Sequence, residues 1–307
     1  MRVAFTSDIH VDISRENHLL VDLMVEHLQV ETPDVFILCG DISPSSEQFA
    51  ETLARFRPVS CKKLMVPGNH DVWVDSKNKL KKGIDSTIKY TQILPQACQE
   101  NDFLCFGTEP FQLDKIGFAG CMGWYDYSYR NPLFDDTIHE DAYKAGELIL
   151  GSDRPEVSFW NDKRYAWWLR RPGQHLFNLR SRAVCRPDKD ICGEMILSLG
   201  NQLKTLESTG VDRIVVVTHF VSFRDMVIYK DELPIDFFTA YDGSEELERT
   251  IRSCRLVTHC LCGHSHTLKD RMIGSIRAMS SPVGYLTKMG AEQLRQVAVE
   301  KLMFVDV

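Results

Sequence analysis

The sequence predicts an α/β fold, because short apolar runs typical of buried strands alternate with amphipathic helical segments in both halves of the chain. Several of these runs end abruptly in small or polar residues, as strands do where they lead into loops. Aspartate and histidine gather at those ends. In parallel α/β sheets the carboxyl ends of the strands are where ligands bind.

Three apolar runs in the first part of the chain are expected to form strands, at residues 3–5, 35–39 and 64–66. A helical stripe runs from Leu20 to Leu28 between the first two, and a second stripe runs from Phe49 to Phe56 before the third. This strand, helix, strand, helix, strand order predicts parallel crossover units.

The same pattern returns after residue 190. A helical stripe from Met195 to Leu206 precedes an expected strand at residues 214–217, and a further strand is expected at residues 256–262. Ser244 and the two glutamates after it resemble an N-cap with an acidic first turn, which predicts a short helix before that strand. Residues 277–280 and 297–307 are expected to be sheet.

The middle of the chain, about residues 123–190, differs in character. Periodicity fades, aromatic residues crowd together, and residues 151–190 hold nine Lys and Arg against five Asp and Glu. We interpret this segment as an irregular, cap-like insertion into a single domain that spans residues 1–307.

Composition excludes several classes of protein. The chain of 307 residues is 44% hydrophobic and 26% charged, which is ordinary for a globular protein and argues against disorder or a coiled coil. The net charge of −7 makes nucleic acid an unexpected partner. Ten cysteines spread over this length are expected to be free thiols. We find neither a signal peptide nor an apolar run that could span a membrane. A cytoplasmic location is therefore expected.

Five segments at the expected strand ends carry groups that bind metals. They are Asp8-Ile9-His10, Gly40-Asp41, Gly68-Asn69-His70-Asp71, His219 and Gly263-His264-Ser265-His266. Carboxylate, amide and imidazole groups suit Mn, Fe, Zn or Co. Placement at strand ends would direct all five segments into one crevice, and the glycines allow the backbone to turn sharply and approach a metal closely.

These motifs, in this order, resemble those of the calcineurin-like metallophosphoesterases. The resemblance covers residues 8–266, most of the chain. Protein serine/threonine phosphatases of that superfamily continue the second motif as Gly-Asp-x-x-Asp-Arg-Gly, whereas here Gly40-Asp41 is followed by Ile42-Ser43-Pro44-Ser45. The resemblance is therefore to the small bacterial-type branch. It implies a four-layer α/β/β/α sandwich of two mixed sheets flanked by helices, with the insertion near the active site.

The resemblance also implies a dinuclear metal centre, with Mn or Fe expected and Zn as an alternative. One ion would be held by Asp8, His10, Asp41 and His266, and the other by Asp41, Asn69, His219 and His264. Two ions at such a centre can bind a phosphoryl oxygen and lower the pKa of a bridging water, so that hydroxide attacks phosphorus. His70 would stabilise charge or protonate the leaving group, and Asp71 would orient His70 or stabilise its charge.

The expected activity is hydrolysis of a small phosphate ester. A phosphodiester, such as a nucleotide-type substrate, is favoured because His70 could protonate an alkoxide and because the insertion offers aromatic and basic groups. Hydrolysis of phosphomonoesters is the alternative, and a non-catalytic metal-binding scaffold is the alternative of another class. Candidate substrate-binding residues are Asn69, Tyr127, Arg130, Asn161, Asp162 and Arg164.

Overall fold

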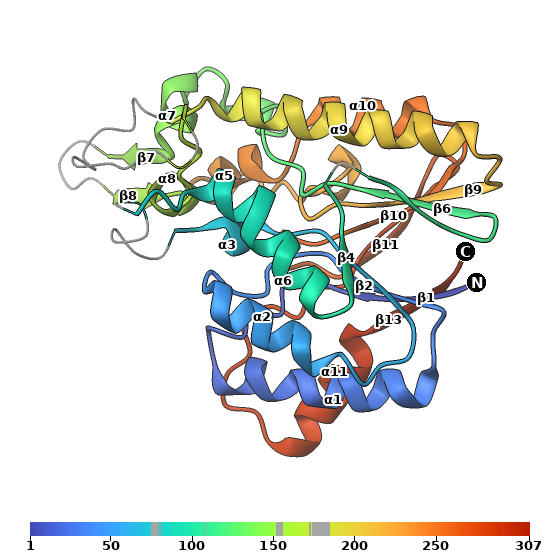
Figure 1. Cartoon of the computed structure of the whole chain (residues 1–307). Helices are drawn as coiled ribbons and strands as arrows, with labels where there is room; N and C mark the ends of the chain where they lie inside the picture. Colours follow the sequence, from blue (N-terminus) through green and yellow to red (C-terminus); the bar gives the residue numbers. More distant parts are fainter. Residues whose placement is uncertain (75–79, 81, 108, 152–155, 172, 174–184) are drawn as a thin grey trace.

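A computed structural model describes residues 1–74, 80, 82–107, 109–151, 156–171, 173 and 185–307. Part of the basic middle segment, including Arg154, Arg180 and Arg182, lies outside these described residues. Two large sheets pack face to face and carry helices on their outer sides, so that the described residues form the expected α/β/β/α sandwich (Figure 1).

The first sheet has five strands in the order β13-β1-β2-β3-β4. Their bounds are β1 Arg2–Thr6, β2 Val35–Leu38, β3 Lys62–Met65, β4 Phe103–Cys105 and β13 Met303–Asp306. The strands β1 to β4 are parallel, and β13 is antiparallel to β1. Helices on its outer side are α1 Arg15–Glu31, α2 Ser46–Arg55, α6 Leu94–Glu100 and α11 Ala291–Lys301 (Figure 1).

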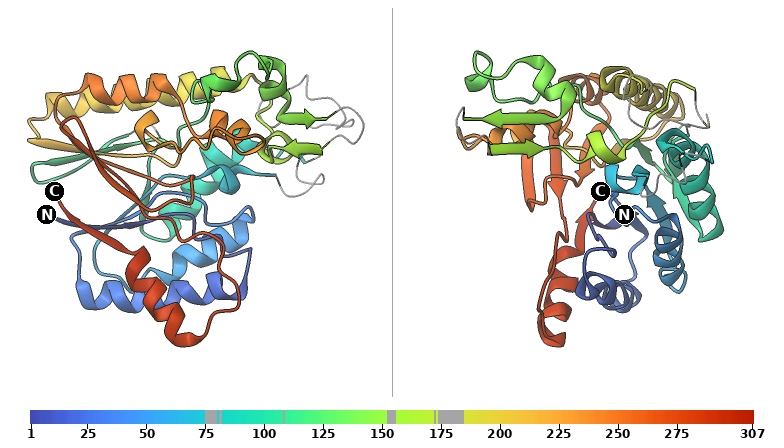
Figure 2. Two further views of the ribbon diagram at one scale, coloured as in Figure 1. Left: turned by 180° about the vertical axis from the view of Figure 1, so that it is seen from behind. Right: turned by 90° about the vertical axis from the view of Figure 1, so that its left-hand side faces the viewer.

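The second sheet has six strands in the order β11-β12-β10-β9-β6-β5. Their bounds are β5 Phe111–Leu113, β6 Ile116–Gly120, β9 Arg213–Val217, β10 Val257–Cys262, β11 Lys269–Ile273 and β12 Ile276–Ser280. The four central strands are parallel, and the two edge strands are antiparallel to their neighbours. Helices α9 Asp188–Ser208 and α10 Glu245–Ser253 lie side by side over its outer face (Figures 1 and 2).

Alternation along the strands explains why the two sheets pack together. In β1, Val3 and Phe5 belong to the buried cluster between the sheets, while Ala4 belongs to the cluster beneath the helices. Val215 and Val217 of β9 face the same inter-sheet cluster from the other side. A strand that is buried on both faces is apolar along its whole length, and these strands were predicted from such apolar runs.

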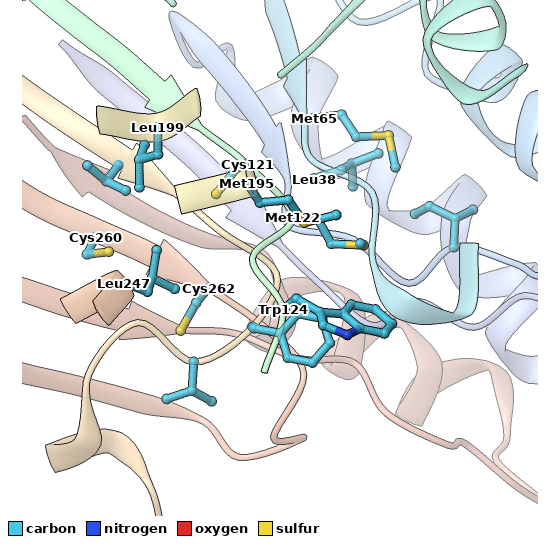
Figure 3. Close-up of a cluster of buried hydrophobic side chains, with 14 of the residues drawn as sticks. Leu38, Met65, Cys121, Met122, Trp124, Met195, Leu199, Leu247, Cys260 and Cys262 are labelled. Atoms are coloured by element: carbon cyan, nitrogen blue, oxygen red, sulfur yellow. The ribbon is translucent and has the colours of Figure 1, made fainter. Parts of the chain in front are cut away.

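On the outer face of the second sheet, side chains of the covering helices pack against side chains of the strands and of the loops that follow them. Figure 3 shows Met195 and Leu199 of α9 and Leu247 of α10 in one buried cluster with Cys121 and Cys260. All ten cysteines are free thiols, as expected, and most are buried.

Between β6 and α9 the chain forms the insertion, whose elements project at one end of the molecule (Figure 2). They are η2 Pro132–Phe134, α7 Glu140–Ala145, β7 Glu147–Leu150, β8 Glu156–Phe159 and α8 Asp162–Tyr165, with β7 and β8 paired as an antiparallel hairpin. Short elements elsewhere are α3 Asn69–Val72, α5 Ser86–Ile88, η1 Lys89–Ile93, η4 Arg224–Met226 and η5 Ile235–Tyr241. Among the described helices, none is both long and apolar enough to cross a bilayer.

The structure corrects one predicted element and confirms another. Residues 297–301 were expected to be sheet but form the end of α11, and only Met303–Asp306 make a strand. Leu294 and Ala298, four residues apart, are both buried, so helical packing decides the conformation over the strand preference of the valines. Ser244 caps α10 as predicted, since its hydroxyl accepts the backbone N–H of Glu246 at 3.1 Å.

Candidate metal centre

The five motif segments meet at one edge of the sandwich, because each follows a parallel strand. Asp8 and His10 follow β1, Asp41 follows β2, and Asn69 follows β3. His219 follows β9 of the opposite sheet, and His264 and His266 follow β10. The two sheets therefore contribute to the same centre from opposite sides.

Several of these side chains are presented by a strained backbone. Asp8, His10, Asp41, His264 and His266 have φ values of 53°, 48°, 59°, 70° and 49°. Positive φ is uncommon for residues other than glycine, and it concentrates where function requires a fixed geometry. Hydrogen bonds from Asp8 N to Gly40 O (2.9 Å) and from His10 N to Asp41 O (3.0 Å) hold the first two loops together.

One half of the centre groups Asp8, His10, Asp41 and His266. Nε2 of His10 lies 3.1 Å from Nε2 of His266, and it lies 3.7 Å from Oδ2 of Asp41. Nε2 of His266 lies 3.4 Å from Oδ1 of Asp8. Four donor atoms thus converge on one point, in the combination expected for the first metal.

The other half groups Asp41, Asn69, His219 and His264. Oδ1 of Asn69 lies 2.9 Å from Nε2 of His219 and 3.1 Å from Nδ1 of His264. The same His219 nitrogen is 3.4 Å from Oδ2 of Asp41. Asp41 Oδ2 therefore faces both halves, which is the placement a bridging carboxylate requires.

Backbone carbonyls orient two of the imidazoles. Nδ1 of His219 is 2.8 Å from the carbonyl oxygen of Cys39, and Nε2 of His264 is 3.1 Å from that of Tyr241. A carbonyl accepts only a protonated nitrogen, so the opposite ring nitrogen of each histidine is left to face the centre. This outer hydrogen bond is the usual arrangement of a metal-binding histidine.

Burial and charge set the protonation of these groups. Burial and the neighbouring His219 lower the pKa of His264 to about 3, which keeps its imidazole neutral. Burial also acts against protonation of His219, but the Asp41 carboxylate raises its pKa to about 9. Asp41 itself is buried, yet the surrounding imidazoles hold its pKa well below the usual value. With these values the Asp41 carboxylate is anionic, His219 beside it is protonated and His264 is neutral.

Two of the expected glycines allow the close packing of this centre. A Cβ on Gly263 would lie 2.6 Å from Oδ2 of Asp8, and one on Gly40 would lie 2.6 Å from Nδ1 of His219. Gly40 also has a φ of 86°, which a side chain would strain.

His70 lies beside the first half of the centre. Its ring stacks on Trp73 at 3.6 Å between centroids, and its edge meets the His10 ring at 4.6 Å. Its backbone N–H donates to Oδ1 of Asp41 at 2.9 Å. Burial lowers the pKa of His70 to about 4 despite the nearby Asp41, so the imidazole is neutral at neutral pH and can donate one N–H.

The expectation that Asp71 orients His70 is wrong. Both carboxylate oxygens of Asp71 instead accept backbone N–H groups, from Asp41 (2.9 Å), Gly68 (2.8 Å), Ile42 (2.8 Å) and Ser43 (2.9 Å). Among the described residues, Nδ1 of His70 is buried and has no hydrogen-bond partner. Asp71 therefore fixes the loop after β2 against the turn after β3, and so positions Asp41.

A cavity of about 220 Å³ opens in front of the centre. Its lining residues are Asp41, Asn69, His70, Trp73, Trp160, Asn161, His264, His266 and Tyr285. Of the predicted substrate-binding residues, Asn69 and Asn161 reach this cavity.

Three other predicted substrate residues point elsewhere. The hydroxyl of Tyr127 binds Asp188, and Arg130 pairs with Asp135 at 2.7 Å on the surface. The guanidinium of Arg164 lies over the Phe159 ring at 3.9 Å. None of the three lines the cavity.

Asp162 has a different role from the predicted one. It is buried and accepts Nδ2 of Asn69 (2.9 Å), Nε1 of Trp73 (2.6 Å) and Nε1 of Trp160 (2.9 Å). It thereby turns Oδ1 of Asn69 towards the two histidines and holds the two indoles that wall the cavity. Asp162 is a positioning residue, supplied by the insertion.

Sequence reasoning missed Tyr285, whose ring lies 4.9 Å from both His10 and His266. The signal was available, since Tyr285 follows β12, which is parallel to β10 and ends at the same edge. The loop after β12 contains no residue of a type that binds metals, so a search for metal-binding motifs does not find Tyr285.

Comparison with known proteins agrees with this geometry. The family model of the calcineurin-like phosphoesterases matches residues 1–268. The chain belongs to this family. It is accordingly a metal-dependent phosphoester hydrolase of a dinuclear type, and the residues gathered here fit such a centre.

Solved structures share the fold. Phosphopantetheinyl hydrolase from Mycobacterium tuberculosis matches with a TM-score of 0.68 at 16% identity, covering 99% of this chain and 95% of that one. A dimetal phosphatase from Danio rerio matches with a TM-score of 0.53 at 13% identity, covering 91% and 86%. No match was found among the curated proteins.

Proposed function

We propose that this phosphoesterase hydrolyses phosphodiesters, with Asp8, His10, Asp41 and His266 holding one metal ion and Asp41, Asn69, His219 and His264 the other. The observation that carries the ligand assignment is the convergence of two four-donor groups on the shared Oδ2 of Asp41. When bound, the two ions supply a nucleophilic hydroxide and polarise the phosphoryl oxygens. We propose Mn or Fe as the metal, with Zn as the alternative, since carboxylate, amide and imidazole donors are compatible with all three.

The chain's own residues then account for binding and proton transfer. His70 lines the cavity with a neutral imidazole, stacked on Trp73 and therefore fixed in orientation. Its N–H can donate to a phosphate oxygen or to the departing oxygen, which stabilises the charge that develops there. Asn161 offers an amide at the same cavity.

The composition of the cavity wall favours a diester over a monoester. Among the described residues that line it, none is lysine or arginine. A monoester carries about two negative charges at neutral pH and a diester only one, so a diester depends less on extra cations. Trp73, Trp160 and Tyr285 provide apolar surface against which the second ester group can pack.

The substrate itself is tested by comparing two chromogenic esters with Mn²⁺ present. We expect kcat/KM for bis-p-nitrophenyl phosphate to exceed that for p-nitrophenyl phosphate by about tenfold or more, equivalent to about 1.4 kcal/mol in the transition state. Faster hydrolysis of the monoester would contradict the proposal. The similarity to a hydrolase named for phosphopantetheinyl groups makes such conjugates a sensible natural diester to assay next.

The role of His70 is tested with His70→Ala on two diesters. Loss of a proton donor should reduce kcat by about 10²- to 10⁴-fold on diphenyl phosphate and by less on bis-p-nitrophenyl phosphate, whose leaving group needs less protonation. Equal losses on the two esters would mean that His70 binds the phosphate without protonating the leaving group.

A further inference from the structure

Tyr285 lies in the wall of the metal-centre cavity, although this residue is 54% exposed. Its ring is inclined at 64° to the His10 ring and at 84° to the His266 ring. It therefore borders the half of the centre that is proposed to hold the first metal ion. A single exposed aromatic side chain is ordinary on a protein surface, so the surroundings of Tyr285 have to show whether its position serves the site.

Hydrogen bonds fix the backbone on both sides of Tyr285. The N–H of Gly284 donates to the carbonyl oxygen of Asp8 at 3.0 Å. Asn17 of α1 is buried, and its Nδ2 donates to the carbonyl oxygen of Gly284 at 2.7 Å. Its Oδ1 accepts the N–H of Leu286 at 3.0 Å. The loop after β12 is thereby tied to the loop after β1, and an exposed side chain on a firmly held loop beside a site is typical of a residue that contacts ligand.

The ring of Tyr285 also has a face that is open to a ligand. Trp73 stacks on His70 at 3.6 Å, and Trp160 stacks on Tyr241 at 4.9 Å and 11°. Within the described part of the chain, Tyr285 has no stacked neighbour, because its two imidazole contacts are both steeply inclined. Of the tryptophan and tyrosine rings that line the cavity there, Tyr285 is therefore the one best placed to stack on a substrate.

The cavity is too small to enclose a whole diester. Its volume of about 220 Å³ lies below the range of about 300–1,000 Å³ that is usual for sites that bury a ligand of drug size. The phosphoryl group can enter, whereas an ester group has to extend past the rim. The leaving group is assigned to His70, so the ester group that stays on phosphorus is the one available to Tyr285.

We propose that Tyr285 is a specificity-determining residue, whose exposed ring packs against the ester group that the phosphate retains after hydrolysis. The substrate class is a phosphodiester whose retained group carries a planar, apolar ring close to phosphorus, because such a ring gains most from an open aromatic face. This inference rests on the proposed diesterase activity, and it adds which of the two ester groups is selected and by which residue.

Two diesters with the same leaving group test the proposal. Phenyl p-nitrophenyl phosphate and methyl p-nitrophenyl phosphate both release p-nitrophenolate and differ only in the group that phosphorus retains. With the Mn²⁺-loaded enzyme we expect kcat/KM to be at least threefold higher for the phenyl ester. Tyr285→Ala should lower kcat/KM for the phenyl ester by about 3- to 10-fold, the effect of losing one aromatic pair, and should change the methyl ester by less than twofold.

Two further variants separate packing from other effects. Tyr285→Phe keeps the ring and removes the hydroxyl, so it should keep the wild-type preference for the phenyl ester. Phe159→Ala is the matched control, because Phe159 is a similarly exposed aromatic residue (41%) that does not line the cavity, and it should leave both rates unchanged.

The ratio of the two kcat/KM values decides the outcome. An unchanged ratio in Tyr285→Ala, including an equal loss on both esters, would overturn the role of Tyr285 while leaving the diesterase activity in place. A ratio that falls as far in Tyr285→Phe as in Tyr285→Ala would also overturn it, since the hydroxyl and not the ring would then select the substrate. A wild-type enzyme that hydrolyses neither diester would overturn the proposed activity and this inference together.

Discussion

Asp41 divides its two carboxylate oxygens between two tasks. Oδ2 faces His10 at 3.7 Å and His219 at 3.4 Å, whereas Oδ1 accepts the backbone N–H of His70 at 2.9 Å. One side chain would thereby be shared by the two proposed metal ions, and it also fixes the backbone of the proposed proton donor. The loop that carries it is fixed in turn by Asp71.

Replacement of Asp71 is expected to affect stability. Asp71→Ala leaves four backbone N–H groups without their acceptor, which should lower the free energy of unfolding by about 3 kcal/mol or more. Urea denaturation measures this loss, with His70→Ala as the control because Nδ1 of His70 makes no hydrogen bond to any residue that the structure describes. A stable Asp71→Ala protein would contradict the role assigned to this carboxylate.

Replacement of Asp162 is expected to affect metal binding. Without its carboxylate, the Asn69 amide loses the hydrogen bond that directs Oδ1 towards the centre. Loss of such an outer partner reduces metal affinity or activity by about 10- to 100-fold. Metal titration of Asp162→Ala measures the change, and Asp135→Ala on the surface should titrate as the wild type does. Unchanged affinity in Asp162→Ala would remove Asp162 from the account.

Among the elements, the turns after strands hold the site together. Two glycine-to-alanine variants, one in such a turn and one in a helix, test whether the need for glycine is confined to the site. Gly263→Ala places a methyl group 2.6 Å from Asp8 Oδ2 and should abolish most metal-dependent activity. Gly193→Ala, within α9, meets nothing within 4 Å and should stabilise the protein by about 0.5–1 kcal/mol. Assays of activity and thermal unfolding on both variants test this, and an active Gly263→Ala enzyme would contradict it.

Strand ends were predictable from the sequence because buried parallel strands are continuous apolar runs followed by polar residues. The motif residues that follow β1, β2, β3, β9 and β10 lie together for that reason. Contacts between the insertion and the metal centre were not predictable. Asp162 binds Asn69, which is 93 residues away in the sequence, and no periodic pattern in the insertion indicates that the two meet. Tyr127 and Arg130 were misassigned because aromatic and basic character does not reveal whether a side chain faces the cavity or the core.

At the scale of the whole molecule, the proposed metals join the two sheets. Asp8, Asp41 and Asn69 come from the first sheet, and His219 and His264 come from the second. Ligands bound only by the folded state stabilise it, by about 2.7 kcal/mol when present at one hundred times their dissociation constant.

Chelation should therefore lower the melting temperature. We expect EDTA to reduce Tm of the metal-loaded protein by roughly 5 °C or more, measured by calorimetry. Asp41→Asn, which lacks the shared ligand, should show little further change on chelation. An identical Tm of the wild-type protein with and without EDTA would show that metal does not connect the sheets.

The most direct test of the account is the metal content of the purified chain after loading with Mn²⁺ and removal of free ions. Elemental analysis should find about two ions per wild-type chain, and fewer than one per chain of Asp41→Asn, because both halves of the centre share Asp41. A wild-type chain that holds one ion or none, or an Asp41→Asn chain that keeps two, would contradict the shared-carboxylate centre.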